Sequence, residues 1–320
     1  MNCNKQTVLI LGGAGFIGSN IISYFLDDGY NVITVDGLLE KTGGRRENLN
    51  KFISGIQFIE SEIEKVKNLS EIINQSSVII DCMGWTSHHL ALSSPEHDLK
   101  LNLLSHIYFI KHLLSCKGKK VIYLGSRGQY GCPQATEITE ETAAVPEDIQ
   151  GIHKLAAESY FRVYSKIYGF NIISLRFPNC FGENQPTSGE DIGLVGGFIR
   201  DALNDEDIYV YGNKRKRNLA YVKDLAEVIF KLSKIEFRGF SIFNLKGEEV
   251  LIEDLVKMLI EIVGKGKCKI KPMPREIKNI DIGNSVINDS RLRELLGVIP
   301  KTDLRSTLVA TVKYFKESLL

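Results

Sequence analysis

Residues 8–18 read Val8-Leu9-Ile10-Leu11-Gly12-Gly13-Ala14-Gly15-Phe16-Ile17-Gly18. Four consecutive apolar residues predict a strand buried on both faces, and apolar residues at helical spacing from Ile17 to Phe25 predict a helix directly after it. The glycines allow a tight turn and a close approach of a ligand to the backbone. The helix N-terminus then offers N–H groups and a partial positive charge to a phosphate. The stretch therefore predicts a dinucleotide site, with these candidate contacts: Gly12, Gly15, Phe16, Ile17 and Gly18.

The next strand, predicted at Val32–Val35, supports the same site because it ends in Asp36. An acid about 20 residues beyond the glycine turn meets the adenosine ribose in dinucleotide-binding proteins. A carboxylate accepts hydrogen bonds from the ribose hydroxyls and repels a 2′-phosphate, so Asp36 favours NAD over NADP. Arg45 and Arg46 follow and could soften this preference, although ordinary surface positions are the other interpretation.

Strands and helices alternate through the first half of the chain. Further buried strands are predicted at 56–59, 78–80, 121–124 and 172–175. This alternation is typical of a parallel sheet with helices on both faces. We expect an α/β fold in which residues 1–176 form a Rossmann doubly wound parallel sheet. Residues 177–320 would form a smaller C-terminal α/β substrate-binding lobe, with chain exchange between the two. In that second part we expect helices near 198–203 and from 222, strands at 208–211 and 241–245, and two closing helices.

Composition excludes several classes of partner. The net charge is +1 and charged residues make up 25% of the chain, which gives no electrostatic reason to expect nucleic acid or a membrane as partner. The one basic run, Lys214–Arg217, is short enough to be mostly a solvated loop. Six scattered cysteines show no metal-ligand spacing, so we expect no metal and a reducing, cytoplasmic location. The N-terminus leaves no room for a signal peptide, and no apolar run is long enough to span a bilayer.

Several later motifs follow one another in an order that resembles a known family. They are Ser61-Glu62-Ile63, Asn102, Leu124–Gly131, Lys154–Glu158, Leu175–Gly182 and Arg217–Asp224, whereas Ile80–Gly84 after the predicted fourth strand does not match the family's pattern. Together with the glycine turn and Asp36, this series resembles the extended short-chain dehydrogenase/reductase family, specifically its nucleotide-sugar epimerases and dehydratases. The resemblance covers almost the whole chain and implies hydride transfer between a sugar carbon and NAD.

The resemblance also implies roles for individual residues. Glu62 would meet the adenine, while Gly84 and Asn102 would lie on the cofactor side. Lys154 would bind the nicotinamide ribose and Ser126 the reacting hydroxyl. On the substrate side, Asn179 would contact the substrate and Arg217 would hold its diphosphate.

The position of the catalytic tyrosine also departs from the family pattern. The family's base is the tyrosine of a YxxxK motif, and the residue four before Lys154 is Gln150. Residues four apart share a helix face, so Gln150 should occupy the place of that tyrosine. Glutamine does not titrate and cannot take up the hydroxyl proton. We therefore expect an atypical active site.

Three interpretations follow from this replacement. Another group could carry the proton, with His153, His88 and His89 as candidates of suitable pKa and Tyr130 as an aromatic alternative. Gln150 could instead orient the substrate in a slow or substrate-assisted oxidation. The protein could also be a catalytically silent binder of NAD or a nucleotide sugar.

Residues after Ser126 narrow the reaction. The family's dehydratases and decarboxylases carry acidic residues there, whereas this chain has Arg127 and Gly128. Guanidinium stays protonated and cannot act as a general acid or base at neutral pH. Arg127 could bind an anionic substrate group, or it could be an outward structural arginine.

These observations favour an NAD-dependent epimerase acting on a nucleotide-diphosphate sugar, with C4 as the reacting carbon by analogy. A dehydratase or ketoreductase with a relocated acid/base is the alternative enzyme. Family analogy also implies a homodimer formed through the helices around Leu103–Leu114 and Lys154–Tyr168. Tyr160, Phe161 and Tyr164 are the apolar residues expected at its surface.

Overall fold

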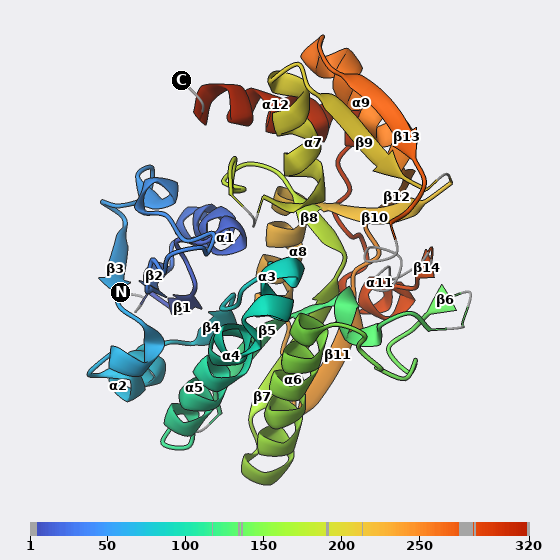
Figure 1. The fold of residues 1–320 in the computed structure, drawn as a ribbon. Helices are drawn as coiled ribbons and strands as arrows, with labels where there is room; N and C mark the ends of the chain where they lie inside the picture. The colour runs from blue at the N-terminus through green and yellow to red at the C-terminus, as the bar shows by residue number, and fades with distance from the viewer. Residues whose placement is uncertain are drawn as a thin grey trace.

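The computed structural model describes residues 5–116, 118–133, 135, 137–189, 192–212, 214–274, 284 and 286–318, and only the backbone of residue 89. Its centre is a seven-stranded sheet (Figure 1). Across the sheet the strands are β11 (Phe240–Asn244), β7 (Asn171–Phe177), β5 (Lys120–Ser126), β4 (Val78–Asp81), β1 (Thr7–Leu11), β2 (Asn31–Asp36) and β3 (Ile56–Glu60). All neighbouring pairs are parallel. This is the Rossmann strand order, with the switch point between β1 and β4, and it confirms the predicted fold class.

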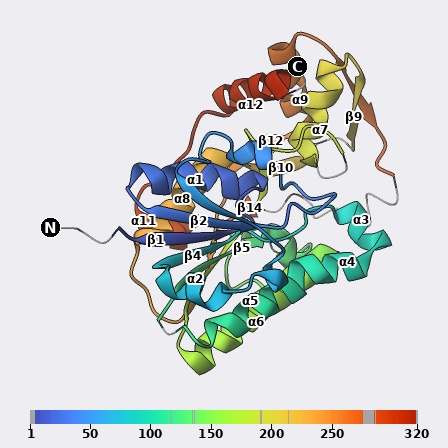
Figure 2. The same ribbon diagram turned by 90° about the vertical axis from the view of Figure 1, so that its left-hand side faces the viewer.

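Helices cover both faces of the sheet, as Figure 2 shows in a side view. On one face lie α1 (Phe16–Asp27), α8 (Val222–Lys234) and α11 (Ser290–Leu296), and on the other α2 (Leu69–Gln75), α5 (Ser105–Leu113) and α6 (Ile149–Tyr168). The apolar residues of β1 alternate between these two cores and are fully buried. Burial on both faces explains why the strands are continuous apolar runs in the sequence.

After the first lobe segments, the chain returns to the main sheet and adds one more strand to it. The strand predicted at 241–245 is β11, which pairs with β7 at the edge of the main sheet. Helix α8 packs on α1, with the rings of Phe25 and Phe230 5.2 Å apart. Within residues 177–320, β11, α8 and α11 therefore belong to the main sheet and its helical layer, and the remaining elements form the lobe.

The lobe contains α7 (Gly193–Leu203), α9 (Ile252–Val263) and α12 (Leu304–Ser318). Two small sheets accompany these helices, β12 (Glu248–Leu251)–β10 (Lys216–Tyr221)–β8 (Asn179–Phe181) and β13 (Lys267–Lys271)–β9 (Asp207–Tyr211). Helix α7 begins five residues before the predicted Phe198, because three glycines in its first turns hide its helical pattern. The basic run is partly ordered structure, since Lys216 and Arg217 open β10.

Short elements complete the description. They are η1 (Arg46–Leu49), η2 (Ile63–Lys65), α3 (His88–Ser93), α4 (Pro95–Leu99), η3 (Lys100–Leu104), η4 (Arg127–Tyr130), β6 (Glu137–Ile138) and β14 (Val286–Ile287), the last two forming a parallel pair. Among the residues described, no helix is both long and apolar enough to cross a membrane.

Candidate active site

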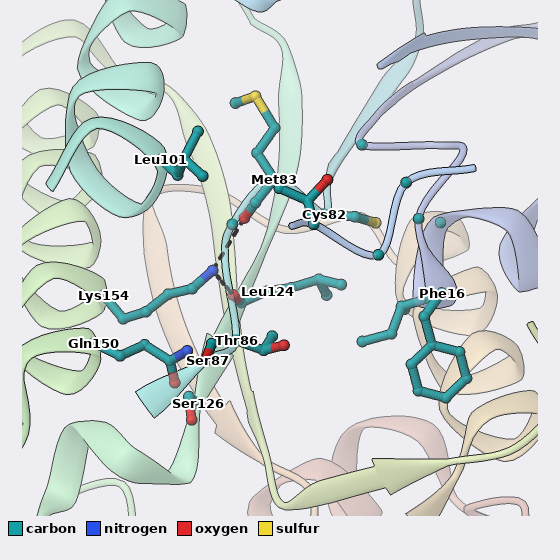
Figure 3. Close-up of a pocket in the computed structure, with 18 of the residues that line it drawn as sticks. Phe16, Cys82, Met83, Thr86, Ser87, Leu101, Leu124, Ser126, Gln150 and Lys154 are labelled. Atoms are coloured by element: carbon teal, nitrogen blue, oxygen red, sulfur yellow. Dashed lines mark hydrogen bonds between the residues drawn. The ribbon is translucent and has the colours of Figure 1, made fainter. Parts of the chain in front are cut away.

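A cavity of about 630 Å³ opens at the carboxyl ends of the sheet strands, beside the switch point. Its walls come from the loops after β1, β2, β4 and β5 and from the lobe segment after β7. In Figure 3, Lys154, Gln150 and Ser126 lie on one side and Phe16 of the glycine turn on the other. Of the predicted site residues, the cavity is lined by Gly12, Gly15, Phe16, Ile17, Gly18, Asp36, Glu62, Gly84, Ser126, Arg127, Gln150, Lys154 and Asn179.

The glycines of the turn have separate physical tasks. Gly12 has φ +74°, and a Cβ there would lie 3.0 Å from the backbone of Cys82. At Gly18 a Cβ would lie 2.3 Å from the carbonyl oxygen of Gly12, so this glycine lets α1 pack against the turn. Gly15 is the N-cap residue of α1 and has no side chain to occupy the helix N-terminus. No side chain caps this helix end, so the first backbone N–H groups of α1 can donate to a phosphate.

Asp36 is held at the end of β2. Its carboxylate accepts hydrogen bonds from the backbone N–H groups of Ala14 (3.0 Å) and Leu38 (2.9 Å). Burial raises the pKa of the Asp36 carboxyl, and these N–H groups oppose that rise. A carboxylate fixed in this way at the cavity wall fits a ribose diol.

The two arginines near Asp36 do not line the cavity. Arg46 pairs with Glu60 on the surface, and Arg45 donates to the carbonyl oxygen of Gln185 at 3.3 Å. Glu62 lines the cavity near them and accepts from Lys100 at 2.8 Å. Hydrogen bonds from Lys100 and Lys65 lower the pKa of the Glu62 carboxyl, so it is ionised at neutral pH.

Lys154 is buried on the inner side of α6. Its Nζ donates to the carbonyl oxygens of Met83 (3.1 Å) and Leu124 (3.2 Å), as Figure 3 shows. Burial lowers the pKa of the Lys154 ammonium, and the charge of Asp81 at the end of β4 opposes this effect. The lysine is thus clamped between the ends of β4 and β5.

Gln150 lies one helical turn before Lys154 and is 5% exposed. Its Nε2 donates to the carbonyl oxygen of Trp85 at 2.6 Å. Asn102 was expected beside the cofactor, but its side chain is fully buried outside the cavity lining. It donates to Trp85 O and Asp98 Oδ2 and accepts from Trp85 N, all within 3.0 Å. Gln150 and Asn102 therefore both fix the turn after β4.

Ser126 ends β5 with its hydroxyl in the cavity. The hydroxyl accepts from the N–H of Gly128 at 3.1 Å, and the Ser126 N–H donates to Gln129 Oε1 at 2.7 Å. Gln129 in turn donates to the buried Glu158, which is paired with Arg176. A buried polar network thus positions the hydroxyl. Arg127 follows it, is only 5% exposed and lines the cavity, which contradicts the outward interpretation of this arginine.

The candidate proton carriers occupy different surroundings. His153 lies outside the cavity lining, with Nδ1 2.6 Å from Asp98 Oδ1. Tyr130 is buried and donates to Asn244 Oδ1 at 2.8 Å, and burial raises the pKa of its phenol. His88 lines the cavity, with Nδ1 3.0 Å from Asp148 Oδ2. The side chain of His89 lies outside the described part of the structure.

Sequence reasoning missed Asp148, Thr86 and Ser87, which all line the cavity. Asp148 carries a recognisable signal, because an Asp immediately before the first residue of a helix is a favoured N-cap. Nothing in the sequence announces its contact with His88. Arg217 shows the reverse case: it lies on β10 and is not among the lining residues of the cavity.

Comparisons with known proteins agree with this geometry. Residues 8–245 match the NAD dependent epimerase/dehydratase family. The chain belongs to this family. It is an NAD-dependent enzyme family, and the turn, Asp36 and Lys154 fit that cofactor. The resemblance in motif order is therefore confirmed.

Individual members show how far the likeness extends. A putative UDP-glucose 4-epimerase of Methanocaldococcus jannaschii is 27% identical over 97% of this chain and 99% of its own length. A dTDP-4-dehydro-6-deoxyglucose reductase of Escherichia coli is 29% identical over 81% of this chain and 82% of its own. The structure of the UDP-glucose 4-epimerase of Thermotoga maritima with UDP-glucose superposes with a TM-score of 0.87. The two proteins are 27% identical, and the superposition covers 98% of this chain and 100% of the other.

Proposed function

We propose that this protein binds NAD and a nucleotide-diphosphate sugar in one cavity and epimerises the sugar by reversible hydride transfer at a ring carbon, C4 by family analogy. A single observation supports this most: the cavity that contains the glycine turn and Asp36 is continuous with Ser126, Lys154 and the lobe residue Asn179. A cofactor and a second ligand can therefore meet end to end in it.

On the cofactor side, the N-terminus of α1 would receive the pyrophosphate and Asp36 the adenosine ribose. Glu62 would lie beside the adenine, and Lys154 would hold the nicotinamide ribose. When bound, NAD accepts a hydride from the sugar and returns it. Because the Lys154 ammonium is fixed by two carbonyl oxygens, it would place the ribose without moving.

On the substrate side, Ser126 would bind the reacting oxygen and Asn179 the sugar nucleotide. Arg127 would face an anionic group of the substrate, since a buried guanidinium at a cavity wall favours an anion. Arg217 is left out of this assignment because it does not line the cavity.

A ketoreductase is the second candidate. A reductase adds hydride to a carbonyl and still needs a proton donor, which Gln150 cannot be, so another group would again have to serve as the acid. The Escherichia coli relative that carries the name of a reductase supports this choice.

The first experiment is to denature the purified protein and identify the released small molecules by mass spectrometry. Released NAD, alone or with a sugar nucleotide, supports an epimerase that recycles its cofactor. The protein is then incubated with UDP-glucose, UDP-galactose and, with NADH, a 4-keto sugar nucleotide. Interconversion without net NADH use supports the epimerase, and stoichiometric NADH use supports the reductase. Binding without turnover of any of these would indicate a silent binder and contradict the proposal.

The protein would act as a homodimer in the cytoplasm. Helices α5 and α6 lie side by side at the surface (Figures 1 and 2), and α6 exposes Tyr160, Val163, Ile167 and Tyr168. An apolar surface of this kind fits a second copy of the same two helices. Phe161 does not belong to it, since its ring is fully buried against the sheet, contrary to expectation.

A further inference from the structure

A histidine–aspartate pair lies in the cavity wall close to the position where the family has its tyrosine. His88 opens α3, Asp148 precedes α6, and both side chains line the cavity. His88 Nδ1 lies 3.0 Å from Asp148 Oδ2, and the imidazole is about half exposed while the carboxylate is largely buried. The pair thus combines an anchored acid with an imidazole that faces the site.

Asp148 is held rigidly. Its Oδ1 accepts from the N–H of Gly151 at 2.6 Å and so caps α6, which leaves Oδ2 for the imidazole. Burial acts to raise the pKa of the Asp148 carboxyl, but the hydrogen bond and charge of His88 and the Gly151 N–H outweigh it and lower the pKa. The carboxylate is therefore ionised at neutral pH.

The segment that carries His88 is tied to the same helix. Gln150 donates to Trp85 O at 2.6 Å, and Asn102 holds the same residue from η3. Ser87 caps α3 by accepting from the N–H of Leu90. The glutamine that replaces the tyrosine thus helps to fix the backbone three residues before His88.

The other candidates are less suited to the task. His153 and Tyr130 do not line the cavity, and Lys154 is fixed by two carbonyl oxygens. Among the described side chains that line the cavity, His88 is the one imidazole. With Nδ1–H directed at Asp148, the lone pair of the neutral ring is on Nε2.

We propose that His88, oriented by Asp148, is the acid/base that exchanges the proton of the reacting sugar hydroxyl. In oxidation, Nε2 takes the hydroxyl proton as the O–H bond breaks. Bound NAD would supply the oxidant: it would accept the carbon hydrogen with its electron pair, so that the sugar carbon becomes a carbonyl. In reduction, the hydride returns to carbon and the imidazolium gives its proton to the oxygen. Asp148 stabilises the imidazolium that exists between these steps.

This inference rests on the proposed function, and its pH dependence must be separated from that of neighbouring groups. Charged and titratable groups near His88 include Asp148, His153 and Lys154 at the start of α6, Glu96, His97 and Asp98 of α4, and Arg127 after β5; farther along α6 lie Glu158, Arg162 and Lys166. Of these, Asp148, Lys154 and Arg127 line the cavity with His88.

The test compares His88→Gln and Asp148→Asn with the wild type, and uses His112→Gln as the control. Asparagine is also a good N-cap, so Asp148→Asn removes the charge and keeps the helix start. His112 contacts Ser70 on the opposite face of the sheet from α1 and does not line the cavity. The measurements are kcat and kcat/KM of epimerisation against pH and, on the cofactor-free protein, the imidazole pKa of His88 by NMR.

We expect His88→Gln to lower kcat by about 10²-fold or more. The variant should also lose the acidic limb of the pH–rate profile, in which activity rises with pH as the imidazole loses its proton. Asp148→Asn should lower the NMR pKa of His88 and move that limb to lower pH, because the imidazolium loses its anionic partner. Adding Gln150→Tyr to His88→Gln should restore part of the activity, while His112→Gln should match the wild type.

Retention of the wild-type kcat and acid limb by His88→Gln would overturn the inference, as would an unchanged His88 pKa in Asp148→Asn. The NMR titration decides the pairing even if one variant is poorly active. Absence of turnover by the wild type on every nucleotide sugar would count against the proposed function instead, since the NMR result does not depend on it.

Discussion

The Nε2 of Gln150 donates to the carbonyl oxygen of Trp85 across 2.6 Å, and the two residues are 65 positions apart in the chain. This contact joins α6 to the turn after β4, and Asn102 of η3 also donates to the Trp85 carbonyl oxygen and accepts from the Trp85 N–H. The glutamine therefore has a structural partner of its own and is more than a lost tyrosine.

Replacing Gln150 by Met keeps the length of the side chain and removes its donor. The Trp85 carbonyl then loses one partner in a buried place, so we expect a loss of about 1–2 kcal/mol in the free energy of unfolding. The loosened turn should also lower kcat. Urea denaturation and steady-state kinetics measure the two effects, and unchanged values in both would show that the contact is dispensable.

Replacing Asp36 by Ala should weaken NAD binding by about tenfold or more. It should also reduce the preference of the protein for NAD over NADP. The carboxylate at the end of β2 lines the cavity, where it can accept from a ribose diol and repel a 2′-phosphate. Calorimetric titration with both dinucleotides measures this. Glu40→Ala is the control, because Glu40 is exposed on the same loop and outside the cavity lining. Equal losses in both variants would remove Asp36 from the ribose site.

Lys154→Met should separate activity from stability. The pKa of Lys154 is lowered by burial, which means that folding disfavours its charged form. A depressed pKa makes the unfolded state bind more protons, so the cost is present at neutral pH and falls as pH rises. Methionine removes that cost but also leaves the carbonyl oxygens of Met83 and Leu124 without this donor, so we expect little change in Tm together with a loss of kcat/KM of about 10²-fold. A lower Tm with normal turnover would reverse the assignment.

Glu158→Gln tests the buried network that positions Ser126. Glu158 is paired with Arg176 and accepts from Ser174 at 2.6 Å. Loss of the charge leaves the guanidinium buried with no counterion, which should cost about 3 kcal/mol of unfolding free energy. Glu227→Gln breaks a surface pair with Lys231 and should cost less than about 1 kcal/mol. Similar losses in chemical denaturation would argue against the network.

Val163→Asp tests the dimer surface of α6. Val163 is 46% exposed, so a carboxylate there is solvated in a monomer but buried in the proposed interface. We expect the variant to sediment as a folded monomer under conditions in which the wild type is a dimer. Val309→Asp is the control, because Val309 is exposed to a similar extent but lies on α12, outside the proposed interface. Dissociation by both variants, or by neither, would not fit an α5–α6 interface.

Much of the cofactor side could be predicted from the sequence because its signals are local. A run of apolar residues, glycines at fixed offsets and an acid at the end of the next strand lie within residues 8–36. Their geometry follows from the turn itself, as the positive φ of Gly12 and the contact of Gly18 with Gly12 show. The strand order of the sheet then follows from the topology of this fold class.

The substrate side could be predicted less well. Arg217 has the right neighbours in sequence but lies outside the cavity lining, and Asn102 supports the turn rather than the cavity. Phe161 has the spacing of a surface residue on α6, yet its ring belongs to the core. A helix face shows which residues share a direction, but the neighbouring elements decide what that direction meets.

The sequence by itself determined the fold class, the family and the dinucleotide turn, because each follows from short motifs and periodic segments that are recognisable one at a time along the chain. Only the tertiary structure decided the return of β11 to the sheet, the contact between Gln150 and Trp85, and the pairing of His88 with Asp148. These contacts join segments that are far apart in the chain, and a side-chain contact across such a distance is set by packing of the whole domain. The sequence could therefore show that the tyrosine is absent, whereas the structure shows which imidazole lies in the cavity near its place.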